Sequence, residues 1–210
     1  MLNLDPATLI SRIFVLFTAL TVHEFAHAWT ANYFGDDTPR LNGRLTLNPL
    51  AHLDPIGSLM LIVAGFGWAK PVPVNPYALH RRSDSALMWV SLAGPLSNLL
   101  LAIVAAIPFR VGLVSLYNIY SSTPHFLPSL AELLFNFIIV NLGLMLFNLI
   151  PLAPLDGEKV ISYFLPDNWQ ITFERIRPYG PMILMLLMVT DVFGWIINPP
   201  LSFLLNILLG

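Results

Sequence analysis

The stretch LISRIFVLFTALTVHEFAHAWTANY, residues 9–33, places three ionisable side chains close together in the second half of an apolar run long enough to cross a bilayer. They belong to His23, Glu24 and His27, in the pattern HExxH. Histidines four apart on a helix project from one face, so both imidazoles can reach the same cation. A glutamate beside the first histidine is placed to take a proton from a water that the metal activates.

A structural interpretation of the same pattern is a pair of polar core histidines that bond to neighbouring helices. Inside a span an unpaired imidazole or carboxylate is costly, and nothing structural requires three such groups together. We therefore favour metal binding at His23 and His27.

The composition is that of an integral membrane protein. Of 210 residues, 56% are hydrophobic and 10% are charged, whereas soluble domains carry about 25% charged residues; the mean hydropathy is +0.72. The formal net charge of -2 and the absence of a large basic cluster exclude nucleic acid as an expected partner. The chain has no cysteine, so a metal must be held by histidine, carboxylate or carbonyl groups.

Four apolar segments are long enough to be spans, and they predict an all-α polytopic membrane protein with about four to six transmembrane helices. They are residues 9–33, 86–109, 130–150 and 181–197, and residues 201–209 extend the last one beyond a break at Pro199-Pro200. We expect one domain over residues 1–210, with a core over about 9–160 and C-terminal helices over about 181–209.

Residues 56–69, between the first two spans, are too short and too rich in glycine to cross, and predict a re-entrant or extended segment. Residues 70–76, KPVPVNP, cannot be helical because of their prolines. Non-helical backbone at membrane depth is tolerated only where it is buried in protein or lines a wet cavity. A β-like segment over residues 67–75 is thus placed to hold an opened substrate by β-strand addition.

The loop charges predict an orientation. Lys and Arg occur in the loops over residues 32–84 and 151–180, whereas residues 111–129 contain neither. By the positive-inside rule the two charged loops face the cytoplasm. The N-terminus then lies outside, and the histidine pair lies in the cytoplasmic half of the first span.

A catalytic zinc site typically takes three protein ligands and one open position, so two histidines do not complete it. Asp156, in NLIPLAPLDG at residues 148–157, follows the third span on the same side as the histidine pair and is the natural third ligand. The alternative is an ordinary Asp-Gly turn with an exposed carboxylate. Two prolines and Leu155 give Asp156 an apolar surround, which favours a fixed carboxylate.

Five motifs follow one another along the chain: HEFAH at 23–27, NP at 48–49 with HLDPIG at 52–57, GWAKPVPVN at 67–75, GPLSN at 94–98 and NLIPLAPLDG at 148–157. In this order they resemble the site-2 protease family of intramembrane zinc metalloproteases, peptidase family M50, and in particular its small prokaryotic members without a PDZ domain. The last fifty or so residues carry no motif of the family.

The resemblance implies that His23, His27 and Asp156 ligate one zinc ion and that Glu24 is the general base. It implies hydrolysis of peptide bonds in or near transmembrane segments of protein or peptide substrates, in a prokaryotic cell membrane, with the active site toward the cytoplasm. It also implies that Asn98 hydrogen-bonds the substrate carbonyl or the oxyanion. From the residues alone, an interhelical hydrogen bond by Asn98 is an equal alternative.

Two stripes of mostly small residues are expected to let helices approach closely: Ala19, His23, His27 and Ala31, and Gly94, Asn98, Ala102 and Ala106. We expect Asn148 to support a ligand or end a helix. His52, with Asp54, could support a ligand or be one, but a solvated or structural role is favoured. Asp191 marks a helix break near Gly194 or pairs with another group.

Two rival functions come from other classes. A metal or proton transporter would use intramembrane acids as a relay, and it predicts more carboxylates than these spans contain. An inactive relative that only binds membrane partners would lack the base or a ligand, yet His23, Glu24, His27 and Asp156 are all present.

Overall fold

The structure, a computed structural model, describes residues 6–57, 68–120, 127–190 and 192–210. Within these ranges the chain is helical, and its one β-type pairing is an antiparallel bridge between Leu53 and Ala69. The expected all-α membrane architecture is confirmed. The described helices are α1 (Pro6–Tyr33), α2 (Thr38–Leu41), η1 (Pro49–Ala51), α4 (Pro76–Arg82), α5 (Ala86–Arg110), α6 (Tyr117–Tyr120), α7 (Leu130–Asn148), α8 (Asp156–Phe164), α9 (Asp167–Ile176), η2 (Arg177–Tyr179), α10 (Gly180–Val189) and α11 (Val192–Leu209).

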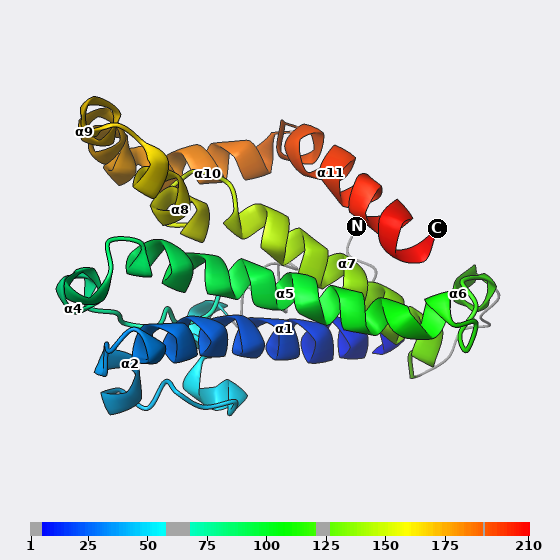
Figure 1. Cartoon of the computed structure of the whole chain (residues 1–210). Helices are drawn as coiled ribbons and strands as arrows, with labels where there is room; N and C mark the ends of the chain where they lie inside the picture. The colour runs from blue at the N-terminus through cyan, green and yellow to red at the C-terminus, as the bar shows by residue number, and fades with distance from the viewer. Residues whose placement is uncertain (1–5, 58–67, 121–126, 191) are drawn as a thin grey trace.

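Three long helices, α1, α5 and α7, form the centre of the molecule, with α5 packed against the other two (Figure 1). Helix α7 begins with a capping box, in which Ser129 Oγ accepts from the Glu132 N–H and Glu132 Oε2 accepts from the Ser129 N–H. Helix α5 continues through Pro95 and Pro108. Prolines are tolerated inside membrane helices because neighbouring groups satisfy the carbonyls that they free.

Small residues bring these helices close together, as the two stripes predict. Ala19 and Ala31 of α1 are fully buried. On α5, Ala102 and Ala106 pack against Ile138 and other apolar side chains of α7 and α11. The two stripes are therefore buried between helices, and this prediction is confirmed.

In the part of the chain that the structure describes, four helical segments are long and apolar enough to cross a membrane: Leu9–Tyr33, Ala86–Arg110, Leu130–Asn148 and Val192–Leu209. The first three confirm the expected spans to within two residues at their ends. The expected position of the fourth is wrong.

Residues 181–197 do not form one helix, and Pro199-Pro200 do not end one. Helix α10 ends at Val189, whereas α11 contains Gly194 and runs unbroken through both prolines. A membrane helix accommodates such prolines, so residue type alone misplaces the break. Asp191 lies outside the described residues, so its role stays a prediction.

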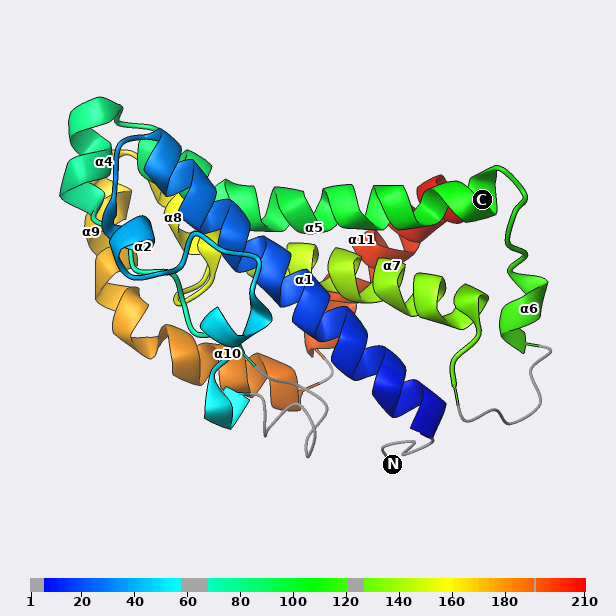
Figure 2. The same cartoon turned by 90° about the horizontal axis from the view of Figure 1, so that it is seen from below.

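The polar elements gather at one end of the bundle. Helices α2, α4, α8 and α9 lie where α1 ends, and α6 lies at the opposite end (Figures 1 and 2). Helix α8 packs against α5. Because α7 returns the chain to this end, the second half of α1 and the start of α8 meet there although they are far apart in sequence.

Candidate metal centre

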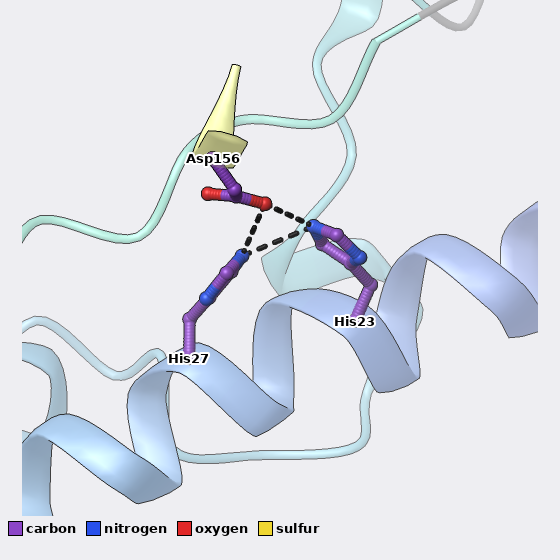
Figure 3. A group of neighbouring side chains, drawn as sticks. All are labelled: His23, His27 and Asp156. Carbon is purple, nitrogen blue, oxygen red and sulfur yellow. Dashed lines mark hydrogen bonds and ion pairs between the residues drawn. The ribbon is translucent and has the colours of Figure 1, made fainter. Parts of the chain in front are cut away.

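Three side chains meet between α1 and the start of α8 (Figure 3). His23 Nε2 and His27 Nε2 lie 3.0 Å apart, and Asp156 Oδ2 lies 3.2 Å from each of them. All three residues are buried. The structure thus brings together the two histidines and the carboxylate that the sequence singled out, with one donor atom of each aimed at a common point.

A glycine sets the position of Asp156. A Cβ atom on Gly157 would lie 2.4 Å from Leu149 O and 2.5 Å from Ile150 O. Only glycine lets the chain approach the end of α7 this closely. Asp156 is buried at the start of α8, so the alternative of an exposed Asp-Gly turn is wrong.

The charge state of Asp156 follows from its neighbours. Burial by itself raises the pKa of Asp156, but the charges and hydrogen bonds of His27 and His23 outweigh burial and hold that pKa well below its ordinary value. The carboxylate is therefore ionised and is available as a ligand at neutral pH.

Helix α5 holds the far nitrogen of each imidazole. His23 Nδ1 lies 2.7 Å from Asn98 Oδ1, and His27 Nδ1 lies 2.6 Å from Val90 O. Because a carbonyl oxygen only accepts, each Nδ1 donates, and each Nε2 can bind a cation once the proton that it shares with Asp156 is released. Metal-binding histidines are commonly held in this way.

Asn98 is fully buried behind His23, and its Nδ2 donates to Asn141 Oδ1 at 2.9 Å and to Ala19 O at 3.3 Å. Asn141 in turn donates to Phe137 O within α7 at 2.8 Å. The structure thus places Asn98 in an interhelical hydrogen-bond chain, which was the equal alternative. A contact between Asn98 and substrate stays a prediction that this placement does not favour.

The donor set suits a zinc ion. Two imidazole nitrogens and one carboxylate oxygen are typical catalytic zinc ligands, and ligands 2.0–2.1 Å from a tetrahedral ion lie about 3.3 Å from one another. The observed separations of 3.0 and 3.2 Å are within a few tenths of an ångström of that value. A Cβ atom on Gly94 would lie 2.5 Å from His27 Nε2 and 2.6 Å from His23 Nε2, so this glycine keeps the space beside the donors open.

A cavity of about 140 Å³ opens beside the three donor atoms, and Asn148 and Lys159 are among its lining residues. Glu24 also lines it, and Glu24 Oε2 accepts from the Val72 N–H at 3.0 Å. No described residue donates to Glu24 Oε1. One oxygen of this carboxylate is therefore fixed, and the other can accept a proton.

An extended segment forms another part of the cavity lining. Pro71, Val72 and Val74 line the cavity. Along residues 71–74 the half-buried valines alternate with exposed prolines, which is the two-residue alternation of a strand. The predicted non-helical conformation is confirmed over residues 70–75, but Pro76 already begins α4. Most of the predicted re-entrant segment, residues 58–67, lies outside the described residues.

His52 and Asp54 do not join the three donors. His52 is buried, and its Nε2 lies 2.8 Å from Thr46 O, so a solvated role is wrong and a structural one is confirmed. Asp54 Oδ1 accepts from two backbone N–H groups of the following turn. Asn148 is the last residue of α7, and its side chain donates to Leu144 O at 3.0 Å.

Sequence reasoning missed two side chains near the site, Asn141 and Arg44. Asn141 had a usable signal, since an amide inside an apolar span usually bonds to another helix. Arg44 had none, because one arginine in a loop is ordinarily solvated. The bond between the Val72 N–H and Glu24 was also missed, because backbone contacts leave no residue signature.

Known proteins support this site. "Putative zinc metalloprotease YwhC" of Bacillus subtilis (strain 168) is 40% identical over 190 residues, which cover 90% of this chain and 85% of that protein. "Putative zinc metalloprotease Rip2" is 31% identical in Mycolicibacterium smegmatis and 28% identical in Mycobacterium tuberculosis (strain H37Rv), each over 181 residues, 84% of this chain and 65% and 66% of those proteins. No family model and no solved structure matches the chain. The likeness to YwhC along nearly the whole chain shows that this protein belongs to the site-2 protease family.

Proposed function

We propose that this protein is a zinc-dependent endopeptidase that cleaves other proteins in or near their transmembrane segments. One observation carries the proposal: three donor atoms 3.0–3.2 Å apart lie within a membrane-spanning helix bundle, beside a glutamate whose Oε1 accepts from no described residue. The names of the relatives support zinc and proteolysis.

Different residues of the chain have different roles in the proposed reaction. His23, His27 and Asp156 would hold zinc, and Glu24 would accept a proton from the attacking water and return it to the leaving amine. A bound zinc ion polarises the scissile carbonyl and lowers the pKa of a water to about 7. Asn98 acts through His23, because its Oδ1 fixes the imidazole tautomer.

The substrate must present an extended strand, because a helix hides its carbonyl groups in hydrogen bonds. Val72 and Val74 line the cavity from an extended segment, and no described residue accepts from the Val74 N–H. Residues i and i+2 of a strand face the same edge, so this N–H is placed like that of Val72. We propose that it pairs with the opened substrate by β-strand addition.

The location follows from the loop charges. The site lies at the end of the bundle where the loops rich in Lys and Arg begin, and these loops favour the cytoplasm. We propose a multi-pass protein of a prokaryotic cell membrane with its site toward the cytoplasm. No observation favours the transporter or the inactive relative.

The test compares purified wild type with Glu24→Gln in detergent, on a candidate transmembrane peptide, with bound zinc measured in both. We expect one zinc per chain in each protein and a turnover at least about 10²-fold lower in the variant, because general-base catalysis contributes about 10²- to 10⁴-fold. Equal turnover would exclude Glu24 as the base. A wild type without stoichiometric metal would end the protease proposal.

A further inference from the structure

A buried arginine lies near the cavity but not in it. Arg44 is 4% exposed, and among the described residues no carboxylate lies within ion-pairing distance of it. Burial lowers the pKa of Arg44, and the negative charge of Glu24 acts in the opposite direction. A buried charge is costly unless it is paired or hydrogen-bonded. The hydrogen bonds of the Arg44 guanidinium therefore indicate the role of this residue.

The guanidinium of Arg44 joins two backbone segments. One terminal nitrogen donates to Ala51 O and the other donates to Lys70 O. The planar fork of an arginine can donate to two separate acceptors at once, which an ammonium on a flexible stem does poorly. Arg44 therefore fixes the distance between residues 51 and 70.

Further contacts pair the same two segments. The Lys70 N–H donates to His52 O at 2.8 Å, and Leu53 and Ala69 form the antiparallel bridge. A Cβ atom on Gly57 would lie 2.2 Å from Trp68 O. Residues 51–57 and 68–70 are thus two paired backbone segments. Arg44 links them at Lys70, the residue next to the cavity-lining segment.

The paired segments are directly connected to Glu24, the proposed general base. Only Pro71 separates Lys70 from Val72, whose N–H donates to Glu24 Oε2 at 3.0 Å. Two residues of strand span about 6.6 Å, and the ring of Pro71 removes rotational freedom between them. A shift of the Lys70 carbonyl therefore moves the Val72 N–H by a similar amount.

We propose that Arg44 is a positioning residue, which holds Lys70 so that the Val72 N–H fixes the Glu24 carboxylate for proton transfer. The role in proton transfer rests on the proposed function, but the holding of the segment does not. A residue with only a structural role would support the loop without any effect on turnover.

The first experiment compares the zinc-loaded full chain carrying Arg44→Met with Arg40→Met. Methionine keeps an unbranched stem but removes every donor, and the exposed Arg40, which pairs with Asp37, is the matched control. We expect Arg44→Met to lower kcat by about 10-fold or more, since one hydrogen bond to a charged group corresponds to about 10- to 100-fold. Zinc content and KM should stay near wild type, and Arg40→Met should change nothing.

A double-mutant cycle tests the route. Val72→Pro removes the N–H that reaches Glu24, so it should lower kcat by a similar factor. If Arg44 acts through this N–H, adding Arg44→Met to Val72→Pro should cost less than about twofold more, because residues in one network are not additive. Fully multiplicative losses would overturn the proposed route.

A third measurement needs no catalysis. The chain has no cysteine, so Val72→Cys gives one thiol on the segment, and its rate of alkylation reports how firmly the segment is held. We expect Arg44→Met to raise that rate about tenfold and Arg40→Met to leave it unchanged. This readout works even if the wild type cleaves nothing, so failure of the proposed function is distinguishable from failure of this inference.

The outcomes decide the proposal. It is overturned if Arg44→Met keeps the wild-type kcat in a protein that cleaves, or if alkylation of the Val72→Cys thiol is not accelerated. If Arg44→Met loses its zinc, guanidinium added to Arg44→Ala decides, because the free ion can occupy the vacated space. Restored turnover then supports the proposal, and no restoration overturns it.

Discussion

The two walls of the cavity are held in different ways. On the donor wall, side chains from α1 and α8 converge and are fixed by α5, through Asn98 on His23 and Val90 O on His27. The other wall, formed by residues 71–74, is here called the backbone wall because main-chain groups hold it. The Val72 N–H donates to Glu24 Oε2, and the Asn75 N–H donates to Asp36 Oδ2 at 2.6 Å. Metal binding and proton transfer therefore depend on different contacts. Variants on the donor wall should change zinc affinity, and variants on the backbone wall should change turnover with zinc affinity unchanged.

The largest effect is expected on the donor wall, at Gly94. Gly94→Ala would place a methyl group 2.5–2.6 Å from both histidine Nε2 atoms, so the imidazoles or the helices must move apart. We expect zinc affinity to fall by at least about 10²-fold, the upper end of the loss seen when a ligand's support is changed. Competition with a metal chelator would measure it.

The matched control is Gly143→Ala in α7, where an added methyl group meets nothing within 4 Å. It should bind zinc as the wild type does. If Gly94→Ala also retains wild-type affinity, the space beside the donors is not where the metal lies, and the separation between the two walls loses its basis.

The donor wall was also the more predictable one, for a physical reason. The spacing of His23 and His27 fixes their common face through helix geometry alone. Asp156 was predictable from its side of the membrane and its apolar surround. Charged groups inside spans are rare enough that each one carries information.

The other wall was predictable only in outline. The prolines of residues 70–76 exclude a helix, but they do not say that the Val72 N–H bonds to Glu24. The role of Arg44 could not be predicted because its acceptors, Ala51 O and Lys70 O, are backbone atoms, which any residue type supplies. The break before α11 was misplaced because Pro199-Pro200 are harmless in an apolar helix.

A smaller effect is expected deeper in the donor wall, at Asn98 and Asn141. Asn98→Leu removes the acceptor of His23 Nδ1, and Asn141→Leu removes the acceptor of Asn98 Nδ2. We expect zinc affinity to fall by about 10- to 100-fold for Asn98→Leu and less for Asn141→Leu, which acts one bond further away. Zinc titration of the two purified variants would give both values.

Asn136→Leu, also in α7, is the control, because Asn136 bonds to Ser11 Oγ at 3.1 Å, away from the histidines. It should leave zinc affinity unchanged. A loss of affinity in Asn136→Leu as large as in Asn98→Leu would mean that the interhelical amides act on packing in general and not on the His23 tautomer.

The smallest effect is expected on the backbone wall, from Val74→Pro, which removes the N–H proposed to pair with substrate. Losing one neutral hydrogen bond of about 1 kcal/mol should lower kcat/KM by roughly fivefold, mainly through KM, with zinc content unchanged. Val74→Ala keeps the N–H and should bind substrate more nearly as the wild type does, so the two variants separate the backbone from the side chain. Cleavage by Val74→Pro at the wild-type rate would count against strand addition at this edge, and the segment would then serve Glu24 alone.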